Sequence, residues 1–421
     1  MLLATLHSDQ SLAQVGISAG LESISNPLRT PVPAQAELLQ SLSADLTVAR
    51  QTERFDTAVS YRVNRQEYRE EVLQDRTLAD GSAVLSWNVM PDTLAWAFSN
   101  SRSNQLIDVS APDVADNRQI IDYTTTGPSM VLPLGAANLL NFGANYSLVS
   151  YEESGLLDQV RTSLNAGVRR NLGRRLVAGI QSNYSETDFD AEVTTNFRVM
   201  SISATAEYAT DRYGFNLEAG QHKSSRANLR SSNPVFSAGA RYRVNSMLNL
   251  TAEYSRSVQD LISELREGSI NRPLPGVEPV PGFEDRFGSS NIAELYLSRS
   301  RSITASYSQR GSYTVNLSYS NDARSSEESN RQDKDERISV DLRVPFSPRL
   351  SWNARTQYSV LTPSRALGDQ ERRIFSLGAV VLINKQMNLV LSGTETRQTG
   401  DLPSDNYDGR NISLTLSYRR Q

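Results

Sequence analysis

The residues of this chain that could do chemistry are few, and their spacing does not assemble a catalytic site. The 421 residues include two histidines and no cysteine, which excludes thiol catalysis, disulfides and cysteine-ligated metals. His222 is followed closely by Ser224 and Ser225, but a serine–histidine pair needs a third group to orient the base, and none is indicated. No clustered histidines suit a metal ion. We therefore expect no enzymatic activity, no cofactor and no metal site.

Charged residues recur on one face of short segments in which apolar and polar residues alternate. A period of two is typical of β-strands, whose successive side chains point to opposite faces. If the polar faces line a barrel, its wall carries both signs of charge in similar numbers. The candidate pore-lining residues are Arg62, Arg161, Arg169, Glu207, Glu218, Arg241, Arg243, Glu253, Asp341, Arg343 and Arg355. Glu22, Asp45 and Asp56 are expected on the same wall. A strongly ion-selective pore would show one dominant sign, and balanced charges also suit a wall that is cross-linked for rigidity.

The elements that carry these residues form a regular series. From near Val15 to Tyr418, gaps of a few residues rich in Asn, Asp, Gly, Pro and Ser take turns with long polar gaps, and the short gaps are suited to tight reversals. The series predicts about 20 strands, within a range of about 18–22, and an even number places both termini at one rim. The predicted fold is all-β: a transmembrane up-and-down antiparallel β-barrel with short periplasmic turns and long extracellular loops.

Composition agrees with a barrel and disagrees with helical membrane proteins. Hydrophobic residues make up 38% of the chain, the mean hydropathy is −0.44, and no apolar run reaches the about 18 to 20 residues that a spanning helix needs. A soluble sandwich would also show alternation. Trp87, Trp96 and Trp352, however, lie beside short gaps, as in the aromatic girdle of a membrane barrel. We expect outer-membrane lipid as a partner and, at a net charge of −4, no nucleic acid.

Two regions fall outside the regular series. Residues 1–14 are interpreted as the remainder of an export signal or a disordered terminus, and residues 15–421 as a single barrel domain. A long proline-rich loop is expected at 259–292, where Val258, Leu261, Ile262 and Leu265 follow helical spacing. This loop either constricts the lumen or caps the outer mouth. The charge clusters at 67–76 and 327–336 are expected to be solvated loops.

The chain resembles a known group of barrels in the style of its strands. The segments that carry the resemblance are Ser298-Arg299-Ser300-Arg301-Ser302, Ser318-Tyr319-Ser320-Asn321 and Val258-Gln259-Asp260-Leu261-Ile262. The group comprises outer-membrane β-barrels encoded with exopolysaccharide and exosortase (PEP-CTERM) systems, of the beta-barrel porin 2 type. The chain departs from many barrels in its end, where Tyr418 is followed by Arg419-Arg420-Gln421 rather than by a terminal aromatic residue.

The resemblance implies an outer-membrane location and a part in polysaccharide export, with polysaccharide and periplasmic export components as partners. Twenty strands about 4.8 Å apart, tilted by roughly 40°, would give a barrel about 40 Å across, wide enough for a sugar chain. Two other functions stay open: a general diffusion porin for hydrophilic solutes, and a surface scaffold or adhesin that transports nothing.

Overall fold

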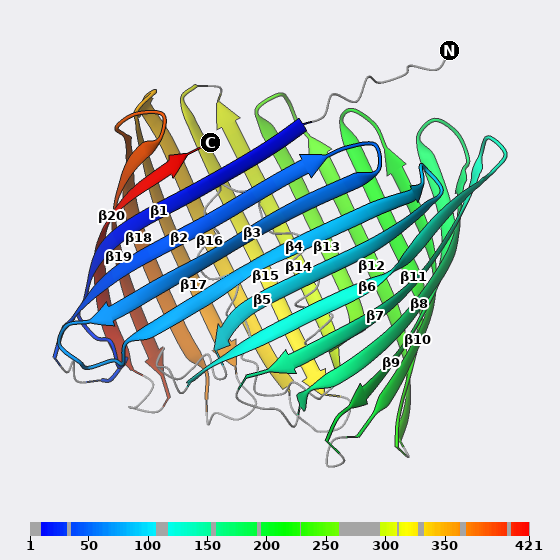
Figure 1. Cartoon of the computed structure of the whole chain (residues 1–421), viewed down its shortest axis with the longest axis horizontal. Coiled ribbons are helices and arrows are strands. Elements are labelled where there is room, and N and C mark those ends of the chain that lie inside the picture. Colours follow the sequence, from blue (N-terminus) through cyan, green and yellow to red (C-terminus); the bar gives the residue numbers. More distant parts are fainter. Residues whose placement is uncertain are drawn as a thin grey trace.

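The computed structural model describes residues 10–31, 35–106, 117–152, 157–191, 195–227, 229–260, 295–309, 311–326, 332–362, 368–401 and 406–420. Within these ranges, 20 strands form one antiparallel sheet in which each strand pairs with its neighbours in sequence. The first strand pairs with the last as well as with the second, so the sheet closes into a barrel (Figure 1). The predicted fold is confirmed.

The strands are mostly 13 to 15 residues long. Their bounds are β1 Gln10–Ile24, β2 Glu37–Gln51, β3 Phe55–Tyr68, β4 Arg76–Met90, β5 Leu94–Leu106, β6 Arg118–Leu134, β7 Asn138–Tyr151, β8 Gln159–Asn171, β9 Leu176–Phe189, β10 Phe197–Ala209, β11 Tyr213–Arg226, β12 Leu229–Arg243, β13 Leu248–Gln259, β14 Tyr296–Gln309, β15 Tyr313–Ser326, β16 Gln332–Ser347, β17 Leu350–Thr362, β18 Gln370–Leu382, β19 Met387–Gly400 and β20 Tyr407–Arg420. None of the described segments is a helix long and apolar enough to cross a membrane.

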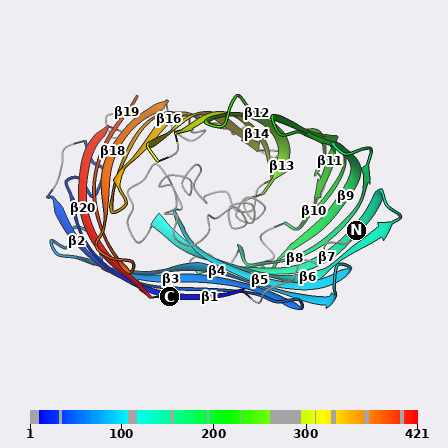
Figure 2. The same cartoon turned by 90° about the horizontal axis from the view of Figure 1, so that it is seen from above.

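Short turns occupy one rim of the barrel, here called the turn rim, and β1 begins and β20 ends there (Figure 1). The opposite rim, the loop rim, carries the longer connections. Viewed from above, the barrel has an oval cross-section (Figure 2). In the turns, side chains accept hydrogen bonds from backbone N–H groups that have no partner in the sheet. Asn245 accepts hydrogen bonds through Oδ1 from the backbone N–H groups of Met247 and Leu248, at 2.8 and 2.9 Å, which closes the β12–β13 reversal within a few residues.

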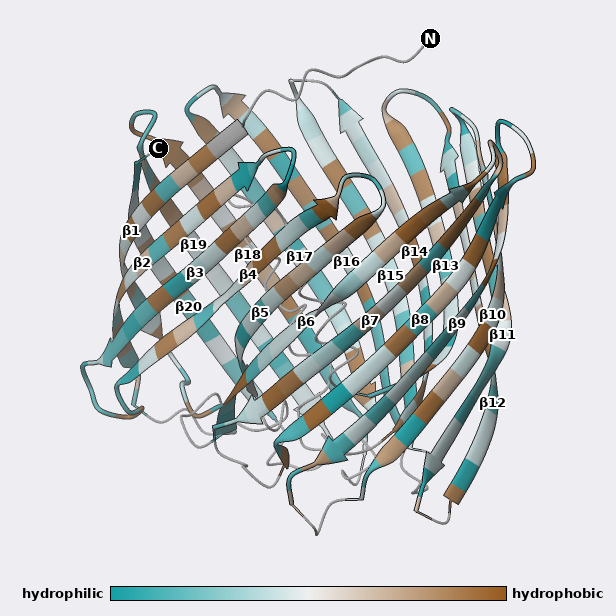
Figure 3. Ribbon diagram, turned by 45° about the vertical axis from the view of Figure 1, so that its right-hand side comes forward, coloured by the Kyte–Doolittle hydropathy of each residue, from teal (hydrophilic) through white to brown (hydrophobic). Residues whose placement is uncertain are grey.

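The two faces of the sheet differ in the way that alternation predicts. On β2, Leu42 and Leu46 point outward and are 58% and 43% exposed, whereas Ser43 between them is 3% exposed on the inner face. The hydropathy colours alternate in the same way along the strands (Figure 3). An outward surface covered with exposed aliphatic and aromatic side chains is far larger than a monomer in water tolerates, and it fits a lipid surrounding.

Outward aromatic rings gather near the turn rim. The rings of Phe55 and Trp87 stack with centroids 6.3 Å apart, and Trp87 lies directly opposite Trp96 across β4 and β5. Tyr208 and Tyr213 flank another turn with centroids 6.1 Å apart. Amphipathic rings favour the boundary between hydrocarbon and water, so these residues mark the edge of the apolar zone.

Three boundaries differ from the sequence-based expectation. β1 begins at Gln10 rather than near Val15, because its first residues pair with the end of β2 at Gln51. The connection between β11 and β12 is only two residues long, although the regular series predicts a long polar gap at this rim, since β11 ends at Arg226 and β12 begins at Leu229. Val258 belongs to β13 rather than to a helix. The rest of the expected loop helix, from Leu261 onward, lies outside the described residues.

The strands also extend into charge clusters that were expected to be loops. Glu67 belongs to β3, Arg76 begins β4, and residues 333–336 belong to β16. The expectation failed because strand residues near the loop rim form ion pairs along and across the sheet, as Arg65 does with Glu67 at 3.5 Å. Charged residues beyond the apolar zone can therefore lie in a strand, where they pair with one another, and do not have to lie in a loop.

Candidate functional site

All the sequence-predicted pore-lining candidates lie on the inner face of the barrel. Cross-strand register establishes this, because directly opposed residues share a face. Asp45 is opposite Arg62, and Asp341 is opposite Arg355. Following the opposed pairs around the closed sheet places the remaining candidates, together with Glu22 and Asp56, on the same face. The candidates do not form one cluster, and their surroundings differ between the two ends of the barrel.

Near the turn rim, the inner charges are exposed. Arg169 on β8 and Glu207 on β10 form an ion pair at 3.6 Å with side chains 58% and 60% exposed. Arg241 and Arg243, at the end of β12, are exposed. Arg343 is exposed as well, and so is Glu253, which lies farther from the turn rim at the depth of Glu218. Exposed ion pairs contribute little to stability, so these groups are available to whatever occupies the lumen.

Halfway along the barrel, the candidates are tied into the wall. Glu218 accepts hydrogen bonds from Gln181 Nε2 at 2.9 Å and from Ser203 Oγ at 2.6 Å. Arg355 pairs with Asp341 at 3.3 Å. These contacts join neighbouring or next-nearest strands. They cross-link the wall, which is the structural role expected where positive and negative charges are balanced.

Asp45 and Arg62 lie at the seam of the barrel. Arg62 donates from Nη2 to Ser43 Oγ at 3.1 Å, and Asp45 forms an ion pair with Arg419 of β20 at 3.8 Å. Gly16 of β1 makes room for this carboxylate, since a Cβ there would lie 2.2 Å from Asp45 Oδ1. The contacts connect β20 with β2 over the glycine of β1, and so reinforce the closure of the sheet.

At the loop rim, the inner wall is packed. Arg161 of β8 is buried, donates from Nε to Thr187 Oγ1 at 3.0 Å and forms an ion pair with Asp260, while its guanidinium lies 6.0 Å from the centre of the Phe197 ring. Asp260 follows directly after β13, whose end no longer pairs with β12 beyond Arg256, and Val258 just before it packs against Phe189 and Phe197. At the far end of the same connection, Leu295 packs against Phe189 and Phe197. The two described ends of the connection therefore both contact the inner wall of β8–β10.

Other buried groups complete the loop-rim half. The carboxylate of Glu37, which is 1% exposed, accepts hydrogen bonds from the backbone N–H groups of Glu70 at 2.8 Å and Val72 at 2.9 Å. Asp335 and Arg337 pair at 3.0 Å with little exposure. The same half contains two apolar clusters, one made of Ile121, Tyr123, Val149 and Tyr151 and the other of Leu39, Tyr68 and Leu73. The sequence analysis selected none of these charged residues, and Asp335 fell in the charge cluster at 327–336 that was expected to be a solvated loop. The signal available was their continuation of the period-two register.

His222 lies buried on the inner face of β11, opposite Ser201 and Asn233. Ser224 follows it on that face, while Ser225 points outward. Among the described residues, no group of three or more His, Cys, Asp or Glu side chains could hold a metal ion.

Comparisons with known proteins agree on the fold. No protein-family model matches the chain, and no curated protein matches its sequence. Solved barrels do resemble it in structure. The FrpB iron transporter of Neisseria meningitidis, in its apoprotein form, matches with a TM-score of 0.54 at 11% identity, covering 99% of this chain and 82% of the transporter. A second FrpB structure matches with a TM-score of 0.51 at 10% identity, covering 97% and 82%. The siderophore receptor PirA of Pseudomonas aeruginosa gives a TM-score of 0.49 at 12% identity, covering 96% and 80%. These similarities show the fold, a large closed antiparallel β-barrel.

Proposed function

We propose that this chain is an outer-membrane pore through which a hydrophilic polymer, namely an acidic polysaccharide, passes from the periplasm to the cell surface. Three features support the proposal: a closed barrel of 20 strands, an apolar outward face and a polar inner face. The resemblance to barrels of exopolysaccharide systems suggests the substrate class. The similarity to iron and siderophore transport barrels supports a transport architecture and carries no substrate to this chain.

The observation that carries the proposal is the exposed charge at the turn rim. Along β8–β12, arginines outnumber the acidic residues there, which are Glu207 and Asp211. These arginines are Arg169, Arg174, Arg175, Arg212, Arg241 and Arg243, together with the outward-facing Arg170, and all are exposed. A charged mouth of one sign raises the local concentration of counter-ions and of polymers with the opposite sign. Because the turn rim faces the periplasm in this fold, an acidic polymer would be attracted on the side from which export begins.

Planar-bilayer recordings test the pore and its preference together. The wild-type protein should conduct and, under a potassium chloride gradient, give a reversal potential that favours anions. The Arg241→Gln/Arg243→Gln variant should shift that potential toward cations while still conducting. A matched variant, Arg397→Gln/Arg410→Gln, changes two outward-facing arginines and should leave the potential unchanged.

Oligomers of a uronic acid, added to the turn-rim side, identify the substrate class. They should block the current at concentrations where neutral dextran of the same length does not, and the Arg241→Gln/Arg243→Gln variant should lose this block. Equal block by both sugars would support a general porin instead. A folded wild-type barrel that never conducts would refute the pore.

The packed loop-rim half favours a second candidate, a surface scaffold that transports nothing. In that case the inner wall is a stabilising core, and the long loops are the functional part. The scaffold predicts no conductance in the wild type and none after Arg161→Ala, a change that should disturb the packing and increase conductance if the barrel is a pore.

A further inference from the structure

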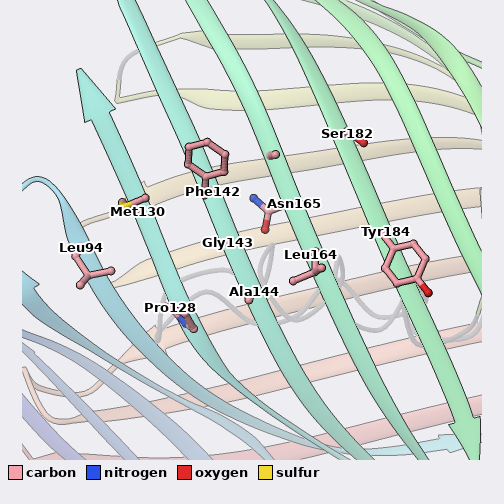
Figure 4. A pocket seen from close by; sticks show the side chains of 11 residues that line it. Leu94, Pro128, Met130, Phe142, Gly143, Ala144, Leu164, Asn165, Ser182 and Tyr184 are labelled. Carbon is pink, nitrogen blue, oxygen red and sulfur yellow. The ribbon is translucent and has the colours of Figure 1, made fainter. Parts of the chain in front are cut away.

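The outward face of β5–β9 carries an apolar groove with a volume of about 520 Å³. Small residues on neighbouring strands, Ala144, Ala166 and Ser182, line the groove. Larger side chains such as Met130, Phe142 and Leu164 line it as well (Figure 4). The register gives Phe142 and Leu164 the opposite parity to the inner residues Arg161 and Arg169, so the groove opens outward, where these two side chains are 41% and 51% exposed. Small outward residues bordered by large ones leave a slot in the surface that faces lipid.

The end of the groove toward the loop rim leads to polar groups. Tyr184 lines the groove and donates from its hydroxyl to Glu186 Oε2 at 3.1 Å. Glu186 lies two residues closer to the loop rim on the same face, and Arg198 of β10 donates from Nε to its Oε1 at 2.7 Å. The Arg198 side chain is 66% exposed. Since a guanidinium has five N–H donors, its outer edge remains free to bind an anion.

Two more cations share this outward face. Lys223 of β11 and Arg230 of β12 are exposed, and the register places both on the outward face with Arg198. On β10–β12 the outward charged residues near the loop rim are all cations, whereas the acidic residues Glu186, Asp188 and Asp190 lie on β9 or directly after it. The groove therefore combines an apolar slot at membrane depth with a cationic region at its end toward the cell surface.

We propose that this groove binds a phosphorylated, multiply acylated glycolipid of the outer leaflet, with an acyl chain in the slot and a phosphate at Arg198 and Lys223. The inference depends on the outer-membrane location in the proposed function but not on any transport. Three observations select this occupant: the slot is apolar and faces lipid, its polar end lies toward the loop rim and hence the outer leaflet, and the charge there is complementary to phosphate.

Binding of purified lipid A to the detergent-solubilised barrel, measured by native mass spectrometry, tests the proposal. Arg198→Gln should weaken binding about fivefold, the equivalent of about 1 kcal/mol for one cation near a phosphate. Ala166→Leu fills the slot and should weaken binding at least as much. The matched controls are Arg410→Gln, an exposed outward arginine that also pairs with a glutamate, and Ala252→Leu, an outward alanine on β13. Both should bind like the wild type.

The lipid itself is varied to identify the occupant. Dephosphorylated lipid A should bind to the wild type at least as weakly as intact lipid A binds to Arg198→Gln, because it loses the contact with Lys223 as well. Phosphatidylglycerol should bind weakly and without sensitivity to Ala166→Leu. Equal loss in the controls, or binding of phosphatidylglycerol as strong as that of lipid A, would overturn the proposal. Heat-dependent gel mobility establishes that each variant is a folded barrel, and conductance, measured separately, reports on the pore alone.

Discussion

The two ends of the inner wall carry similar residue types in opposite environments. At the turn rim, Arg169 and Glu207 form an ion pair that remains more than half exposed. At the loop rim, Arg161 and Asp260 form one that is almost entirely buried. An ion pair in water is worth little, whereas a buried charge that loses its partner is costly. The same residue types are therefore open to the lumen at one end and part of the packed wall at the other.

The largest effect should follow from breaking the buried pair. Arg161→Ala leaves Asp260 without this partner in the packed region, and the free energy of unfolding in urea, measured in lipid vesicles, should fall by about 3–5 kcal/mol. The double variant Arg161→Leu/Asp260→Leu removes both charges and should recover much of the loss. If Arg161→Ala unfolds like the wild type, the loop-rim half is not a core.

Glu37 gives the next largest effect. Glu37→Ala removes a charged acceptor from the backbone N–H groups of Glu70 and Val72, and should cost about 3 kcal/mol. Limited proteolysis should then cleave between residues 69 and 75 faster than in the wild type. Glu53→Ala, an exposed glutamate at the turn rim, is the control and should leave the cleavage rate unchanged.

A substitution at Gly127 of β6 tests how closely the backbones of β6 and β7 approach each other between the two halves of the barrel. A Cβ at Gly127 would lie 1.8 Å from the backbone oxygen of Ala144, whereas one at Gly393 of β19 would come no nearer than 4.0 Å to another group. Gly127→Ala should therefore destabilise the barrel by about 1–3 kcal/mol, because backbone must move. Gly393→Ala should be neutral in the same unfolding assay, and equal effects would contradict the close approach of β6 and β7.

The smallest effect belongs to the exposed pair. Arg169→Ala should lower the free energy of unfolding by no more than about 1 kcal/mol. A loss as large as that of Arg161→Ala would erase the difference between the two halves. In bilayer recordings the same variant should still shift ion selectivity toward cations, because an exposed positive charge leaves the mouth.

Much of this architecture could be predicted from the sequence, and the failures share one cause. Period-two alternation identified the strands and the inner placement of Arg62, Glu218 and the other candidates, since the face of a strand residue depends only on its parity. The charged ends of β3 and β16 were interpreted as loops, because local polarity does not distinguish a solvated loop from a strand whose charges are paired with neighbours. Ion pairs between residues on one face of the sheet distinguish such a strand from a loop, but these pairs depend on the register between strands, which the sequence does not show.

The sequence alone determined that the chain forms strands, which side of each strand is apolar and that the strands close into a membrane barrel, because alternation and turn chemistry are local properties. The tertiary structure decided which charges are buried and which are exposed. Arg161 and Arg169 have the same parity on β8, and nothing near either one in sequence separates them. They differ because Asp260 and Leu295 reach the wall beside Arg161 from strands distant in the sheet, and burial depends on the packing of segments far apart along the chain.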